Sequence, residues 1–79
     1  MKDYTGTEAE IVSKVIDEII KTRKELGLSH QNLADGARLD RSTISLIENK
    51  KRVPSLLTTL RICSVMRLSL ADLLKKYKS

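Results

Sequence analysis

The stretch DRSTISLIENKKR, from Asp40 to Arg52, has the composition of a short helix that ends in a cationic loop. Asp40 belongs to the residue types that favour the N-cap position of a helix. Ile44 and Ile47 are three residues apart, so they would share one face of that helix. The opposite face would expose small polar side chains, followed by three consecutive cations. Small side chains allow a close approach, and the cations favour an anionic partner.

Positive charge is concentrated in the second part of the chain. The net charge is +5, but residues 1–35 carry 5 Lys and Arg against 7 Asp and Glu. Residues 36–79 carry 10 Lys and Arg against 3 Asp and Glu. This asymmetry suggests a polyanionic partner. On charge alone, a basic surface that only keeps the protein soluble remains the alternative.

Length and composition predict one small domain that spans residues 1–79. Hydrophobic residues make up 41% of the sequence, without Phe or Trp, so the core must be aliphatic. A core of this size is marginal, and a homodimer is therefore expected. Cys63 is the only cysteine and lies in an aliphatic run, which predicts a buried, inert thiol.

The sequence predicts a cytoplasmic protein without a membrane span. No apolar run approaches the roughly 18 residues that would cross a bilayer. The first ten residues, MKDYTGTEAE, lack the apolar segment of a signal peptide. No cofactor or metal is expected. An enzyme is not expected either, because the single His and the single Cys have no catalytic partners that the sequence places beside them.

Helical periodicity extends through the chain and predicts an all-α, compact five-helix bundle. Thr7 and Glu10 form a T-x-x-E pattern, typical of a capping box at the start of the first helix. Gly27 is suited to the left-handed position after its end. For residues 1–8, disorder remains an alternative. The later helices are predicted to begin after Ser29, Asp40, Ser55 and Ser69.

The second and third predicted helices are short and joined by the tight turn ARLD, which is the outline of a helix-turn-helix motif over about residues 29–49. In this motif the second helix enters the DNA major groove. Arginine can donate two hydrogen bonds to guanine, and Ser or Thr can bond several base edges. Leu46 would contact a thymine methyl group or be a partly covered leucine. The predicted base contacts are Arg41, Ser42, Thr43, Ser45 and Leu46.

Two further segments are candidates for contacts with DNA phosphates. The loop after the third helix is cationic, and such contacts give affinity without sequence information. The N-terminus of the second helix offers free backbone N–H groups. The predicted phosphate contacts are Ser29, His30, Gln31, Asn49, Lys50, Lys51 and Arg52, together with Arg38 in the turn.

Over about residues 16–74 the chain resembles the Cro/C1-type (xenobiotic-response-element) helix-turn-helix family. Residues 28–34 match the element L-[ST]-x-x-x-L-A, and residues 39–48 match [VL]-[SD]-x-x-x-I-S-x-I-E. A basic loop, Pro54–Ser55 and a leucine-rich helix follow. Within the family, LDRSTIS-IE and the small size are most similar to the controller proteins of restriction–modification systems.

The resemblance implies a phage-repressor-like DNA-binding domain that regulates transcription as a homodimer on palindromic double-stranded sites. Arg41 and Ser42 fall on base-reading positions of the family. Thr43 and Ser45 fall on positions that contact bases or phosphates. RNA polymerase is a further candidate partner, and no small-molecule ligand is expected. The positions that match phosphate contacts in the loop are Asn49, Lys51 and Arg52.

Other correspondences concern the scaffold of the motif. Arg23 and Glu48 match a pair that forms a salt bridge beneath the recognition helix in phage repressors. His30 departs from the family, which usually has Gln there to bond phosphate and to brace the recognition helix. Arg38 and Lys50 stand at positions where the family usually has Gly, so the turns are where the sequence departs most.

The dimer surface is expected on the last two helices, because so small a monomer cannot bury all of their apolar side chains. Packing into the monomer core is the alternative for these residues. A different class of function, an antitoxin or another protein-interaction module, would use the first helix as its contact surface. The predicted dimer contacts are Leu68, Leu70, Leu73, Leu74 and Tyr77.

Overall fold

The computed structural model describes residues 6–77, which form five α-helices and no strand. The helices are α1 (Gly6–Glu25), α2 (His30–Ala37), α3 (Arg41–Glu48), α4 (Leu56–Val65) and α5 (Leu70–Tyr77). This confirms the predicted all-α fold, with α2 and α3 as the helix-turn-helix. No helix within residues 6–77 combines the length and apolar composition that a membrane span needs.

Side-chain caps set the start of three helices at the predicted positions. Ser29 Oγ accepts from the Asn32 amide at 3.0 Å, and Asn32 Oδ1 accepts from the Ser29 amide at 3.2 Å, which completes a capping box. Ser55 and Ser69 accept from the amide three residues onward, at 3.0 and 3.2 Å. Asp40 occupies the N-cap position of α3, but its side chain makes no capping hydrogen bond.

The start of α1 differs from the prediction. The helix already includes Gly6, so Thr7 lies within its first turn and the predicted capping box with Glu10 is wrong. Residues 6–8 are helical, which corrects the alternative of disorder for them, whereas residues 1–5 lie outside the described part of the chain. Gly27 has a φ of 71° and follows α1 as predicted.

Three cations take the left-handed backbone conformation that glycine usually supplies after a helix. Arg38, Lys50 and Arg67 have φ values of 60°, 59° and 56°. In each case the next amide donates to the carbonyl five residues earlier, at 2.8–2.9 Å, as in a Schellman motif. The family resemblance indicated the positions of Arg38 and Lys50, because the family usually has Gly there. Nothing in the sequence indicated Arg67. Each side chain here costs roughly 1 kcal/mol relative to glycine.

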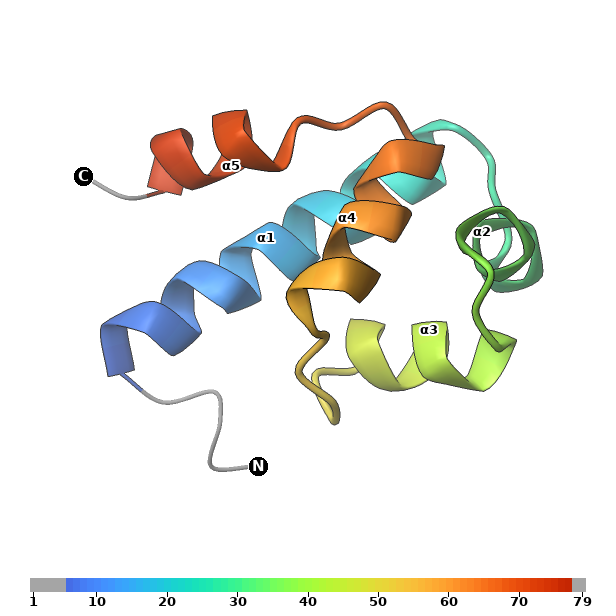
Figure 1. The fold of residues 1–79 in the computed structure, drawn as a ribbon, viewed down its shortest axis with the longest axis horizontal. Coiled ribbons are helices and arrows are strands. Elements are labelled where there is room, and N and C mark those ends of the chain that lie inside the picture. The colour runs from blue at the N-terminus through green and yellow to red at the C-terminus, as the bar shows by residue number, and fades with distance from the viewer. Residues whose placement is uncertain (1–5, 78–79) are drawn as a thin grey trace.

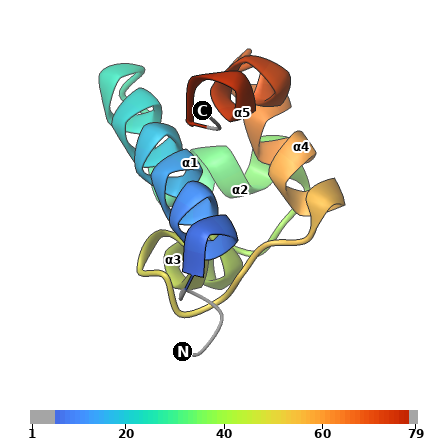
Figure 2. The same cartoon turned by 90° about the vertical axis from the view of Figure 1, so that its left-hand side faces the viewer.

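The helices are arranged so that α3 and α5 lie at opposite edges of the molecule (Figures 1 and 2). The long α1 packs against α5 and α3, while α2 packs against α3 and α4. Gly36 lets α2 and α4 approach closely, since a Cβ there would lie 3.1 Å from both methyl groups of Val65. The core side chains are Val15, Ile16, Ile19, Leu33, Ala34, Ala37, Ile44, Ile47, Ile62, Cys63, Met66 and Leu73.

The core settles two sequence expectations. The Cys63 thiol is 2% exposed, as predicted, and its burial raises its pKa. Leu73 is 7% exposed, so the monomer itself buries it, and the structure removes Leu73 from the predicted dimer surface. Leu68, Leu70 and Tyr77 are partly buried against the same core, and Leu74 remains 40% exposed.

Helix α5 is fastened to α1 through Glu18. The Tyr77 hydroxyl donates to Glu18 Oε1 at 2.9 Å, and Lys76 Nζ lies 3.5 Å from the same oxygen. The hydrogen bond from Tyr77, helped by the nearby lysines, lowers the pKa of the Glu18 carboxyl below its ordinary value of 4.5. A lowered pKa in the folded state means that the ionised carboxylate stabilises the fold.

We expect Tyr77→Phe to lower the free energy of unfolding at pH 7 by about 1 kcal/mol, since one partly buried hydrogen bond is lost. The stabilisation from the Glu18 carboxylate is fully present above 4.5 and is lost as pH falls through the lowered pKa. The difference between wild type and variant should therefore shrink in acid. Urea denaturation at pH 7 and at about pH 3 measures it, and an equal difference at both would contradict this role of Glu18.

Candidate nucleic-acid interface

Helix α3 turns its apolar side inward and its polar side to solvent. Ile44 and Ile47 are each 1% exposed, because they face α1 and α2 across the core. Arg41 and Ser42 are exposed on the first turn, and the other three predicted base contacts, Thr43, Ser45 and Leu46, are partly covered. The predicted base contacts therefore lie on the solvent side of a helix whose other side is fixed in the core.

Two shallow depressions join the exposed side of α3 to the N-terminus of α2. One is lined by Gln31, Arg41, Ser42, Ser45 and Leu46. The other is lined by Arg23, Ser29, His30, Gln31 and Arg41. Gln31 and Arg41 line both, so the two form one continuous concave surface, which we call the α2–α3 surface. It brings together predicted base contacts from α3 and predicted phosphate contacts from α2.

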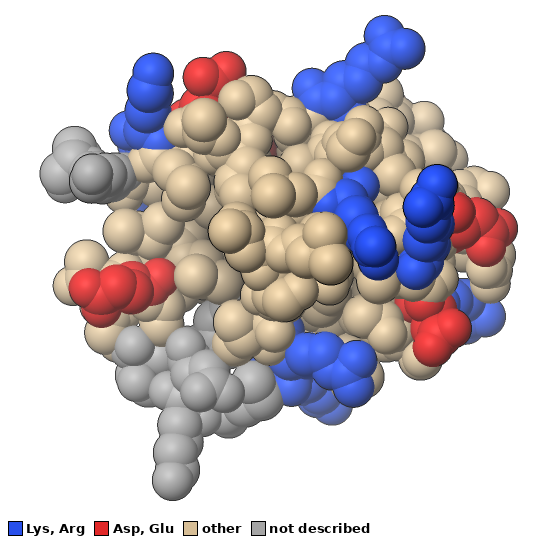
Figure 3. All heavy atoms as spheres, in the orientation of Figure 1, with Lys and Arg blue, Asp and Glu red and all other residues tan. Residues whose placement is uncertain are grey.

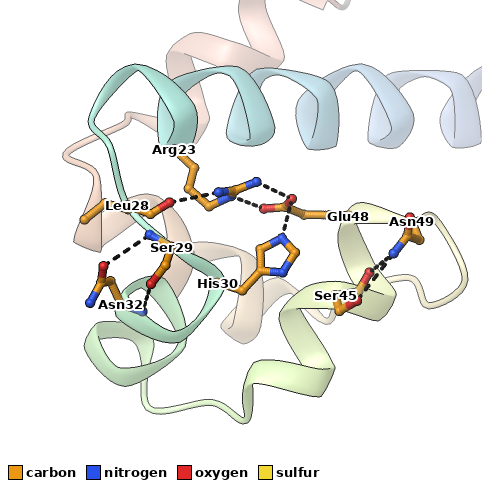
Figure 4. A network of polar contacts seen from close by, with 8 residues as sticks. All are labelled: Arg23, Leu28, Ser29, His30, Asn32, Ser45, Glu48 and Asn49. Atoms are coloured by element: carbon orange, nitrogen blue, oxygen red, sulfur yellow. Dashed lines mark hydrogen bonds and ion pairs between the residues drawn. The ribbon is translucent and has the colours of Figure 1, made fainter.

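A network of polar contacts borders this surface, and two of its members, Arg23 and His30, line one of the depressions (Figure 4). Arg23 donates to both oxygens of Glu48, from Nε to Oε2 at 2.7 Å and from Nη2 to Oε1 at 3.0 Å. Arg23 Nη1 also donates to the Leu28 carbonyl at 2.8 Å. The two charged side chains are only 12% and 8% exposed. The pair that the family resemblance implied thus joins the end of α1 to the last residue of α3.

The sequence did not predict a third member of this network. His30 Nε2 lies 3.0 Å from Glu48 Oε1, so the carboxylate holds residues of α1, α2 and α3 together. His30 and Glu48 are separated by 18 positions. No local spacing rule links residues so far apart. The only indication of this contact was that the family usually has Gln, which braces the recognition helix, where this chain has His30.

In the loop after α3, two of the three predicted cationic phosphate contacts, Lys50 and Arg52, interact with other residues of the protein. Lys50 Nζ lies 2.7 Å from Asp17 Oδ1 of α1, so this predicted phosphate contact is paired within the molecule. Arg52 Nη1 donates to Thr43 Oγ1 at 3.4 Å. The side chain of Lys51 has no hydrogen bond or ion pair with any residue of the described chain and is exposed.

Two other predicted contacts are placed by local structure. Asn49 Nδ2 donates to the Ser45 carbonyl at 2.9 Å, so the amide closes the end of α3. Arg38 does not line the α2–α3 surface. It lines a separate depression between α2 and α4, together with Arg61 and Ser64. The structure therefore groups Arg38 with residues other than the remaining predicted DNA contacts.

We expect Glu48→Ala to lower the free energy of unfolding by about 3 kcal/mol, because it leaves the guanidinium of Arg23 largely buried without its partner. Glu25→Ala is the matched control, since Glu25 is an exposed acid near the end of α1. Chemical denaturation of both variants measures the difference. Equal stability of the two variants would show that the pair does not fix α3.

Comparison with known families supports the assignment of α2 and α3 as a helix-turn-helix. A helix-turn-helix family model matches residues 19–73, which is more than two thirds of the chain and contains the whole of α2, α3 and α4. Comparisons with curated proteins and with solved structures gave no significant match. The matched range includes Arg23, Glu48 and the α2–α3 surface. The chain belongs to the Cro/C1-type helix-turn-helix family of DNA-binding regulators.

Proposed function

We propose that this protein regulates transcription by binding palindromic DNA sites as a homodimer, with α3 as its recognition helix. The observation that carries the proposal is the α2–α3 surface, which places Arg41 and Ser42 beside Gln31 on one concave, solvent-facing surface. The width of the major groove admits an α-helix. The network at Glu48 supports the proposal, because it anchors the far end of α3.

The contacts of α3 divide into base contacts and phosphate contacts. Arg41 is the proposed reader of a guanine, because its exposed guanidinium can donate two hydrogen bonds to O6 and N7. Ser42 and Ser45 reach other base edges, and Leu46 meets a thymine methyl group. Lys51 supplies a phosphate contact, since its exposed ammonium is not engaged by the described chain. The remaining proposed contacts are Ser29, Gln31, Thr43, Asn49 and Arg52.

The proposed dimer contact centres on α4, whereas the residues predicted from sequence lie in α5 or just before it. Leu56, Leu57 and Leu60 are 68%, 58% and 47% exposed, and Leu74 of α5 is 40% exposed. An apolar groove between α1, α4 and α5 includes Leu56, Leu74 and Val12. In the orientation of Figure 1, where α4 crosses in front of α1, the middle of the face is uncharged and charged side chains surround it (Figure 3).

A contiguous apolar area of this kind marks an interaction site rather than an ordinary monomer surface. A second copy of the chain is the proposed occupant, because palindromic sites need two recognition helices, about 34 Å apart. The exposed leucines of α4 line neither depression of the α2–α3 surface, so a dimer formed through them would leave that surface of both copies accessible. RNA polymerase remains a further candidate partner of the bound dimer.

The same apolar area favours a second candidate function. An antitoxin would seat its toxin on an exposed apolar groove, and the groove between α1, α4 and α5 fits that use. The finer assignment as a restriction–modification controller rests on the sequence LDRSTIS-IE and on the small size of the chain. The state of the purified chain separates the two functions, because an antitoxin would need its partner to cover the leucines.

We expect selection from a random duplex pool, at about 0.15 M salt, to enrich a palindrome whose half-sites lie about 10 base pairs apart. Arg41→Ala should lose about 1–3 kcal/mol on that site and relax the preference at one base pair. Lys51→Ala should weaken binding to all sequences and lower the salt slope by about one. No enriched sequence, or equal loss on every sequence for Arg41→Ala, would reject base reading by α3.

We expect Leu57→Glu to weaken self-association by about 2 kcal/mol, because it brings a charge into the proposed apolar contact. Leu26→Glu is the control, since Leu26 is 55% exposed, close to the 58% of Leu57, but lies beyond the end of α1. Analytical ultracentrifugation measures both. A wild type that stays monomeric, or an equal effect of the two variants, would exclude α4 as the dimer contact.

A further inference from the structure

The contact between His30 and Glu48 determines which ring nitrogen of the histidine carries a proton. Glu48 also accepts two hydrogen bonds from the Arg23 guanidinium, so it is present as a carboxylate, which can only accept. Nε2 of His30, at 3.0 Å from Glu48 Oε1, must therefore be the donor. A neutral imidazole has one N–H, so Nδ1 of the neutral ring is an acceptor.

Nδ1 is the nitrogen that remains for a contact outside the protein. It has no hydrogen-bond partner among residues 6–77. The ring lines the α2–α3 surface with Ser29, Gln31 and Arg41, and its side chain is 32% exposed. The phosphate oxygens of DNA are acceptors too. A neutral His30 would therefore set one acceptor against another, whereas a protonated ring would donate from Nδ1 and keep its bond to Glu48.

We propose that His30 is a proton-dependent phosphate contact, which binds DNA phosphate only as an imidazolium held by Glu48. This inference rests on the proposed DNA-binding function. DNA binding would take up one proton at Nδ1, and affinity would rise as pH falls through the range in which histidine changes charge, about pH 5 to 8. The DNA-binding domain itself would thus respond to pH.

The charged groups around His30 come from two other helices, α1 and α3. Glu48 of α3 favours the imidazolium, while Arg23 of α1 and Arg41 of α3, which line the same depression, oppose it. The other neighbours that line it, Ser29 and Gln31 of α2, are neutral. A bound phosphate adds a second negative charge beside the ring. The added charge shifts the ring toward its protonated form, which is the linkage that an experiment can detect.

The effect of His30 on the pH dependence can be separated from that of other side chains. His30 is the only histidine in the chain. Cys63 is buried and its pKa is raised, so it does not titrate in this range. His30→Gln is the matched variant, because an amide can donate a hydrogen bond at any pH and carries no titrating proton. Ser64→Ala serves as the control, since Ser64 is exposed on α4 and lines neither depression of the α2–α3 surface.

The test measures affinity for the selected duplex by fluorescence anisotropy, at constant ionic strength, between about pH 5.5 and 8. Wild type and Ser64→Ala should bind about tenfold more tightly at the acid end, as expected when binding is coupled to the uptake of one proton by a single group. His30→Gln should show little change. Melting temperatures of each protein across the range establish that it is folded under the conditions of the assay.

Two outcomes would overturn the proposal in distinguishable ways. If wild type and His30→Gln bind the duplex with the same pH profile, DNA binding stands and the role of His30 is wrong. If no protein enriches or binds any duplex at any pH, the proposed function itself fails. Nitrogen NMR of His30 adds an independent readout, since the ring in the DNA complex should be the imidazolium. A neutral ring in the complex would also reject the proposal.

Discussion

The position of α3, the proposed recognition helix, depends on one largely buried carboxylate. Glu48 ends α3, and donors from Arg23 of α1 and His30 of α2 converge on it at 2.7–3.0 Å. A helix of eight residues is too short to be stable alone, so its orientation comes from its packing. Ile44 and Ile47 fill the core but leave α3 free to slide along an aliphatic surface. The directional bonds to Glu48 remove that freedom, because a buried charge cannot lose its partners without a large cost.

The location of this anchor explains why one end of α3 is available for contacts. The fixed residue is the last of the helix, while Arg41 and Ser42 lie on its first turn and are exposed. The charged contacts that fix α3 thus lie at its other end and leave the side chains of Arg41 and Ser42 available to a ligand. None of the exposed leucines of α4 lines the α2–α3 surface, so the proposed self-association and the proposed DNA contact would use different surfaces. Such preorganisation reduces the ordering that binding must accomplish.

Local features of the fold were predictable from residue patterns, whereas the distant pair Arg23–Glu48 was expected only through the family resemblance and other distant contacts were not predicted. Ser29, Ser55 and Ser69 were identified as caps because the capped amide lies only three residues away. The pairs His30–Glu48 and Lys50–Asp17 join segments that periodicity cannot relate, so the sequence assigned His30 and Lys50 to DNA phosphates instead. Leu73 and Leu74 show the limit of pattern alone. Both were assigned to a dimer surface, and only the rotation of α5 against α1 decided that the first is buried and the second exposed.

The strained helix ends connect the fold to the charge of the chain. With 3 glycines in the sequence, Arg38, Lys50 and Arg67 take left-handed positions at the ends of α2, α3 and α4. A cation at a helix C-terminus interacts favourably with the helix dipole, by roughly 0.3–1 kcal/mol, which offsets part of the backbone strain. Lys50 gains further from Asp17, which ties the end of α3 to α1 a second time. A glycine at position 50 would relax the backbone but would lose both interactions. The cationic loop is therefore part of what holds α3 in place, as well as a source of positive charge.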